Sequence, residues 1–171
     1  HTKQIYVMDS CSASCGETQL ALLAASLEEQ GLSFEEVVSR LEAFRSEMNT
    51  YFVLESLDTL KKNGRLTGLQ AFFATKLNIK PVMGADNGTI IKLDQARGIQ
   101  KALQRMAEIA VKEAGTTKDK RLVIAHCNAP ERAQFMKEKL CSMAEFKEVV
   151  ITDTCGVSTV YASDGGVILA L

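Results

Sequence analysis

The chain has 171 residues, of which 46% are hydrophobic and 24% are charged, so it can fill a core of ordinary size. Its 20 Lys and Arg residues are balanced by 21 Asp and Glu residues, which leaves no basic surplus for nucleic-acid phosphates. No apolar run approaches the ~18 residues of a membrane-spanning helix, and the amino-terminal residues lack the pattern of a signal peptide. The five irregularly spaced cysteines disfavour a disulfide framework and predict a cytoplasmic protein.

The first 48 residues predict a strand followed by two helices. Residues 4–8 are a short β-prone run that leads into a loop rich in Ser and Cys. Apolar residues at three- and four-residue steps then predict a helix that ends at Gly31. The next helix is expected to begin at an N-cap, Ser33, with Glu36 completing a capping box.

The remainder of the chain predicts strands that alternate with helices. Strands are expected at residues 51–55, 79–85, 89–94, 122–125, 149–151 and 167–171, with a hairpin turn at Asp86-Asn87-Gly88. Helices are expected at residues 57–62, 69–77 and 97–113, from Pro130 onward, and as a turn at 156–162. This order predicts an α/β fold with an α+β-like second domain, in which a two-layer mixed sheet of about six strands has helices on one face.

Several short blocks in a fixed order resemble the DegV family of bacterial lipid-binding proteins. The most specific is the block at residues 57–66, LDTLKKNGRL, which is similar to the family's leucine–lysine–glycine–arginine motif. The other blocks are Asp9-Ser10 with Ser12, Ser14 and Gly16; the helix from Ser33 to Leu41; residues 77–82 followed by Gly88; Ala96-Arg97-Gly98; and Ala125-His126. The resemblance covers essentially the whole chain, but only the carboxy-terminal part of a family member.

The resemblance implies a binding protein of two domains that holds a long-chain fatty acid, or a similar acyl ligand, between them. Residues 1–48 correspond to a remnant of the first α/β domain and residues 49–171 to the second domain. The hydroxyls that hold the fatty-acid carboxylate in the family belong to the part that is absent here. The implied partner is the ATP-binding subunit of a bacterial fatty acid kinase, and no cofactor is expected for this chain.

Four residues are candidates for contact with the ligand or the partner: Arg65, Arg97, Asp153 and Ser158. The guanidinium of Arg65 can bind a carboxylate through two hydrogen bonds, or it can cap the carbonyls of the preceding helix. Arg97 stands at an expected helix start, where either a functional role or a salt bridge to Asp94 accounts for it. Asp153 stands where the family's motif has histidine, and an acidic group there repels an anionic head group unless it is protonated or turned away.

Five apolar residues can either line an acyl tunnel or pack in an ordinary core, because periodicity does not distinguish the two. They are Phe72, Phe73, Leu77, Ile79 and Val82.

Two alternatives to lipid binding remain. The first is a phosphotransferase related to dihydroxyacetone kinase, for which only His126 could hold a substrate covalently. The second is a scaffold or regulatory domain without a ligand. The chain contains no phosphate-binding glycine motif, and the spacing of Cys11 and Cys15 does not suit zinc, so neither an ATP site nor a metal site is expected. We also expect a dimer, or a retained contact with the missing part, to cover the helix faces of residues 1–48.

Overall fold

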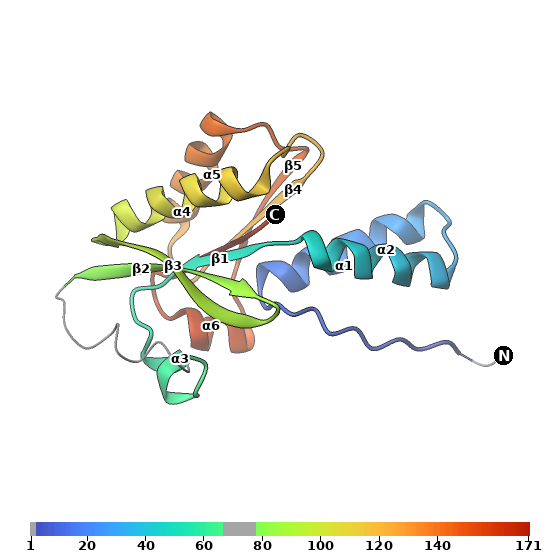
Figure 1. Cartoon of the computed structure of the whole chain (residues 1–171), viewed down its shortest axis with the longest axis horizontal. Coiled ribbons are helices and arrows are strands. Elements are labelled where there is room, and N and C mark those ends of the chain that lie inside the picture. The colour runs from blue at the N-terminus through green and yellow to red at the C-terminus, as the bar shows by residue number, and fades with distance from the viewer. Residues whose placement is uncertain (1–2, 67–77) are drawn as a thin grey trace.

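A computed structural model of the chain describes residues 3–66 and 78–171. Within these residues, six strands form one mixed sheet in the order β3-β2-β1-β6-β4-β5 (Figure 1). Among these six described strands, only β4 and β5 are parallel neighbours. The strands are β1 (Thr50–Val53), β2 (Ile79–Asp86), β3 (Thr89–Arg97), β4 (Arg121–His126), β5 (Glu148–Asp153) and β6 (Val167–Ala170). The helices are α1 (Cys15–Glu29), α2 (Phe34–Glu47), α3 (Asp58–Lys62), α4 (Ile99–Ala114), α5 (Pro130–Met143) and α6 (Gly156–Ala162).

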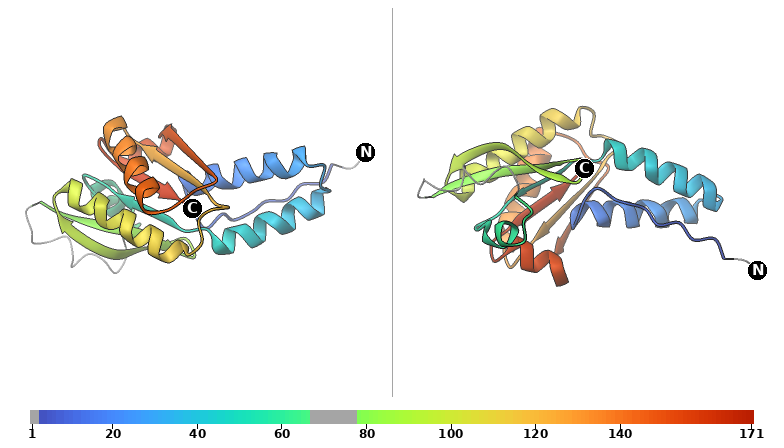
Figure 2. Two further views of the ribbon diagram at one scale, coloured as in Figure 1. Left: turned by 90° about the horizontal axis from the view of Figure 1, so that it is seen from above. Right: turned by 60° about the horizontal axis from the view of Figure 1, so that its bottom comes forward.

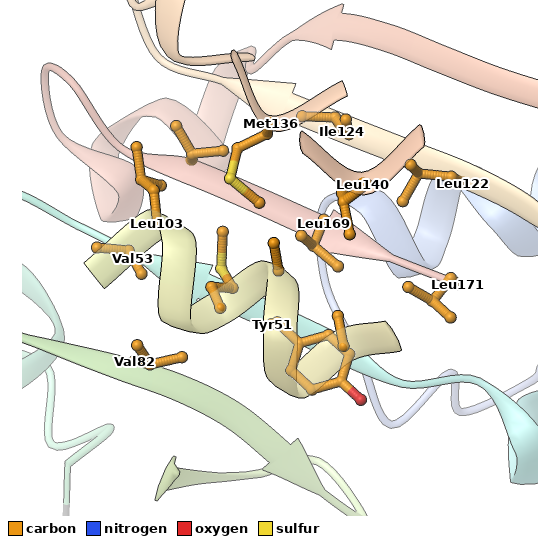
Figure 3. Close-up of a cluster of buried hydrophobic side chains, with 14 of the residues drawn as sticks. Tyr51, Val53, Val82, Leu103, Leu122, Ile124, Met136, Leu140, Leu169 and Leu171 are labelled. Atoms are coloured by element: carbon orange, nitrogen blue, oxygen red, sulfur yellow. The ribbon is translucent and has the colours of Figure 1, made fainter. Parts of the chain in front are cut away.

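The first core lies between the sheet and the two long helices α4 and α5 (Figure 3). Alternate residues of the central strands point toward these helices, as the two-residue repeat of a strand requires. The side chains at the centre of this core are fully buried, and the hydroxyl of Tyr51 donates to Oε2 of Glu113 at 2.7 Å. The labelled core residues are Tyr51, Val53, Val82, Leu103, Leu122, Ile124, Met136, Leu140, Leu169 and Leu171.

The opposite face of the sheet carries a smaller core. The helices α3 and α6 lie over this face, below the sheet in Figure 1, whereas α4 and α5 lie above it. The predicted layer of helices on one face is therefore formed by α4 and α5, and two short helices partly cover the other. The buried residues on this second face include Leu54, Leu60, Met83, Val123, Ala125, Ala162 and Ile168.

The helices α1 and α2 form a hairpin that extends away from the sheet (Figure 2). The predicted capping box at the start of α2 is confirmed, because Oγ of Ser33 accepts the N–H of Glu36 and the Glu36 carboxylate accepts the N–H of Ser33. The first turns of α1 pack on the second face of the sheet, where the amide of the buried Gln19 donates to the carbonyls of Arg121 and Ala170 at 2.7 and 3.0 Å.

The predicted strand at residues 4–8 has no strand partner among the described residues. The segment is extended and lies along α2 instead. The amide of Gln4 donates to Glu35 at 2.7 Å, and the hydroxyl of Tyr6 donates to Glu42 at 2.7 Å. A strand needs a neighbour to satisfy its backbone groups, and the local sequence cannot supply one. The expectation of a strand here is therefore wrong for the described structure.

Most of the turns and boundaries follow the predictions. Asn87 and Gly88 both have positive φ, 47° and 79°, which is the geometry of a type I′ hairpin turn. Gly64 has φ of 68° after α3, as expected for a left-handed helix end. The predicted helix at 97–113 begins two residues later, because Arg97 is the last residue of β3 and Gly98 is the N-cap. The predicted helix at 69–77 lies outside the described residues.

Candidate functional site

A pocket of about 690 Å³ lies on the second face of the sheet and follows β1. Its floor is apolar because β1 alternates: Phe52 and Leu54 face the pocket, whereas Tyr51 and Val53 face α4. The floor is completed by residues from α3, β3, α6 and β6, namely Leu60, Ile90, Ala162 and Ile168. We call this cavity the β1 pocket.

Polar groups lie at both ends of the β1 pocket. At the carboxyl end of β1, Arg65, Ser158 and Tyr161 come from the segment after α3 and from α6, two helices that contact each other. At the amino end of β1, Thr50 meets the loop of residues 9–14 and the β2–β3 turn. Among the described lining residues, Arg65 is the only cation and Asp9 is the only anion. The two charges therefore come from segments at opposite ends of the strand.

The loop at the amino end of β1 is tightly constrained. Oγ of Ser12 and Oγ1 of Thr50 lie 2.8 Å apart, which ties the loop to the strand. A Cβ atom at Gly16 would lie 2.0 Å from Oγ of Ser12, so only glycine permits this approach. The hairpin turn also reaches the loop, since a Cβ at Gly88 would lie 3.5 Å from Cα of Cys11. Loop, strand and hairpin thus form one wall of the pocket.

The carboxyl end of β1 is fixed by an ion-pair network centred on Glu55. The Glu55 carboxylate binds Nη2 of Arg132 at 2.6 Å and Nζ of Lys80, and Lys80 also donates to the Glu55 carbonyl at 2.7 Å. Partial burial by itself raises the pKa of Glu55, but the hydrogen bonds from Lys80 and Arg132 outweigh it and hold this pKa below its usual value. The network anchors the segment that leads from β1 into α3.

The structure places two of the four predicted contact residues at the pocket and two elsewhere. Arg65 and Ser158 line the β1 pocket. Arg97 is exposed at the end of β3, opposite Ile79 of β2, and does not line it. A salt bridge to Asp94 is one of the two explanations offered for Arg97, but in the described residues Asp94 binds Arg105 at 2.7 Å.

Asp153 ends β5 beside His126, which ends the parallel strand β4. Its side chain is 81% exposed, its Oδ1 lies 3.4 Å from Nδ1 of His126, and it is not among the residues that line the β1 pocket. The imidazole of His126 is buried, and its Nδ1 accepts the N–H of Ala129 at 3.3 Å.

The predicted tunnel residues do not form the pocket floor as far as they are described. Val82 is fully buried in the core beneath α4, and Ile79 is half-buried at the start of β2. Phe72, Phe73 and Leu77 lie outside the described residues. Phe52, Leu60 and Ile168 were not predicted as floor residues, although the alternation of residues 51–54 indicates that Phe52 and Leu54 share a face.

The chain is similar to proteins of one family in both sequence and structure. A family model described as uncharacterised protein, DegV family, matches residues 1–170. A DegV-family crystal structure from Ruminococcus gnavus with vaccenic acid is 49% identical, covers 99% of this chain and 61% of its own, and has a TM-score of 0.95. The fatty acid kinase (Fak) B3 protein of Streptococcus pneumoniae, loaded with linoleic acid, is 34% identical with a TM-score of 0.88 and covers 98% of this chain and 59% of its own.

A curated DegV domain-containing protein from Streptococcus pyogenes serotype M1 is 36% identical over 167 residues, which is 96% of this chain and 59% of that protein. The chain thus spans about three fifths of the length of the relatives it matches. None of the helices in the described part of the chain is long and apolar enough to cross a membrane.

Proposed function

The chain belongs to the DegV family, and we propose that it holds a long-chain fatty acid, or a similar acyl ligand, in the β1 pocket. The observation that carries this proposal is the pocket itself, which has a volume of about 690 Å³ and an apolar floor between two polar ends. Burial of an acyl chain on such a floor contributes roughly 0.8 kcal/mol per methylene, so modest polar contacts suffice for tight binding. The relatives crystallised with vaccenic and linoleic acid support the same ligand class.

The charges at the two ends orient the ligand. The carboxylate lies at the end that carries Arg65 and Ser158, because a guanidinium and a hydroxyl both donate hydrogen bonds to it. Asp9 at the opposite end repels an anion. The acyl chain therefore runs along β1 toward Thr50.

The rest of the assignment concerns the whole protein. Residues 1–48 are the remnant of a first domain and residues 49–171 are the second domain, with the ligand held between the two. This boundary falls between α2, which ends at Glu47, and β1, which begins at Thr50. The bound acid is presented to the ATP-binding subunit of a fatty acid kinase, a role supported by the similarity to the Fak B3 protein. The protein works in the cytoplasm, where all five cysteines remain free thiols.

A binding role accounts for the geometry better than a phosphotransferase does. Covalent catalysis by histidine needs an accessible nitrogen with an open path to substrate. His126 is 6% exposed, and its Nδ1 already accepts a backbone N–H. Arg97 is exposed and lies apart from the pocket, which suits contact with a partner protein.

The direct test is denaturing extraction of the purified protein followed by mass spectrometry, on this chain and on a chain of the full length of its relatives. A stoichiometric acyl chain is expected from the full-length protein. Calorimetric titration of the delipidated chain with palmitic acid then measures how much the β1 pocket contributes to the binding affinity. Absence of lipid from both chains, together with turnover of a phosphorylated substrate, would overturn the proposal in favour of an enzyme.

A further inference from the structure

A second, smaller cavity adjoins the β1 pocket at the amino end of β1. It has a volume of about 210 Å³ and shares five lining residues with the larger pocket, which makes the two spaces neighbours. The shared residues are Cys11, Ser12, Thr50, Ala85 and Asn87. On the orientation proposed above, this cavity lies beyond the methyl end of a bound acyl chain. We call it the distal cavity.

The distal cavity is lined almost entirely by hydrogen-bonding groups. Met48 and Ala85 are the only aliphatic side chains among its described lining residues, and the others include Ser10, Ser46, Asn49 and Asn87. The hydroxyls of Ser12 and Thr50 stand on the boundary between the two spaces, 2.8 Å apart. Because one of these hydroxyls donates to the other, one O–H donor and several acceptor lone pairs remain for a ligand.

The charges around the distal cavity favour a neutral group. Arg45, the one cation among its described lining residues, is already bound to the Glu42 carboxylate at 2.9 Å and to the carbonyl of Asp9 at 3.0 Å. Asp86 lines the distal cavity, and Asp9 lines the adjoining end of the β1 pocket. A second carboxylate would therefore meet two like charges and a cation whose charge is already paired with Glu42.

We propose that the Ser12–Thr50 boundary is a subsite for a neutral hydroxyl group carried at the methyl end of the acyl chain, and that this chain prefers ω-hydroxylated fatty acids to plain ones. The inference rests on the proposed acyl binding and adds a substrate class to it. A terminal hydroxyl exchanges hydrogen bonds with Ser12 and Thr50. A terminal methyl at the same place displaces water from polar groups and gives no hydrogen bond in return.

The test compares three ligands of equal chain length on the delipidated 171-residue chain by calorimetry: palmitic acid, ω-hydroxypalmitic acid and the α,ω-dicarboxylic acid. One additional hydrogen bond predicts that the ω-hydroxy acid binds about three- to tenfold tighter than palmitic acid. Like-charge repulsion predicts that the dicarboxylic acid binds more weakly than palmitic acid. Equal or tighter binding of palmitic acid than of the ω-hydroxy acid would overturn the inference and leave the proposed function standing. Failure of all three ligands to bind would overturn both.

Substitutions then locate the preference. Thr50→Val removes the hydroxyl at nearly constant volume and is expected to abolish the preference for the ω-hydroxy acid over palmitic acid. Thr50→Ser restores a hydroxyl and should restore the preference. Ser158→Ala, at the opposite end of the pocket, should weaken the binding of both ligands by the same factor and leave the ratio of their affinities unchanged. A preference that persists in a folded Thr50→Val variant contradicts the assignment of the subsite, and its thermal unfolding curve establishes that it is folded.

Discussion

Oδ1 of Asp153 lies 3.4 Å from Nδ1 of His126, at the carboxyl ends of the parallel strands β5 and β4. The same Nδ1 accepts the N–H of Ala129, so this nitrogen already has a hydrogen-bond donor besides its contact with the Asp153 carboxylate. The Asp153 side chain is 81% exposed and does not line the β1 pocket. An acidic group at this motif position either repels the ligand, is protonated or is turned away from it, and the geometry favours the last of these.

Substitution of Asp153 by Asn should change the affinity for palmitic acid by less than about twofold, because a solvated charge outside the pocket is strongly screened. Calorimetric titration of the delipidated chain measures this. If Asp153→Asn instead tightens binding severalfold, the carboxylate does repel the head group, and the conclusion that its side chain is turned away from the ligand is wrong.

Arg65 should matter more than any other charged residue of the β1 pocket. Replacement by Gln keeps a hydrogen-bond donor but removes the charge. We expect palmitic acid to bind about five- to tenfold more weakly, a small loss for a charge-assisted hydrogen bond because the site is exposed. The same titration of Arg65→Gln provides the measurement.

Arg97→Gln is the matched control for Arg65→Gln. It removes an equal charge from an exposed position outside the pocket, so its effect on affinity reports only the change in net charge. Equal losses from both variants would mean that Arg65 acts through the general field of the protein, or caps α3, and does not touch the ligand.

Local signals in the sequence predicted several turns and helix starts of this chain. They did not predict the order of the strands, which depends on pairing between residues far apart in the sequence. The capping box at Ser33, the Asn87-Gly88 turn and the start of α5 at Pro130 each depend on residues within one or two turns. The strand order could not be derived in this way, because β1 pairs with β6 from the far end of the chain.

In the candidate site, too, local patterns did not predict which residues meet through strand pairing. Phe52 and Ile168 meet on the pocket floor because they are register partners in β1 and β6, and no short-range pattern joins them. Arg65 and Ser158 were named through the family resemblance, and the structure places both in the pocket lining. Val82 was named for the same tunnel because it is apolar, but it packs against the opposite helix layer. Apolar periodicity reports burial and does not report which side of a sheet buries the residue.

The network around Glu55 should make stability depend on pH in the acid range. The folded-state pKa of Glu55 lies below its unfolded value of 4.5, because the hydrogen bonds from Lys80 and Arg132 outweigh the effect of burial. A carboxyl group whose pKa is depressed by folding stabilises the native state above pH 4.5, and this stabilisation is lost as the pH falls through the folded-state pKa.

We therefore expect Glu55→Gln to lower the melting temperature at neutral pH by roughly 2–4 °C, which corresponds to about 1 kcal/mol for a chain of this size. Below pH 4.5 the melting temperatures of the variant and the unmodified chain should converge, because the unmodified chain loses the charge that the variant lacks. Calorimetric scans across this range test the prediction. A difference that stays constant with pH would show that packing, and not the ion pairs, accounts for the loss.

The segment of residues 4–8 presents an uncovered apolar side. Gln4 and Tyr6 bind α2, so the alternate residues Ile5 and Val7 point away from it and are 83% and 88% exposed. An extended segment with unpaired backbone groups and exposed β-branched residues is a site for strand pairing. We therefore expect the chain to form a dimer through this segment, or to retain a contact with the remainder of the protein when both are present.

Light scattering combined with size-exclusion chromatography measures this association. The double substitution of Ile5 and Val7 by Asp should shift the chain toward monomer, because two buried charges without partners oppose any pairing of the segment. Val160→Asp is the control: it adds one charge where the double variant adds two, at a position that is 61% exposed on α6, and α6 lies apart from the segment in Figure 1. A monodisperse monomer of the unmodified chain at every concentration would contradict the prediction, because the apolar side of the segment would then be stable in water on its own.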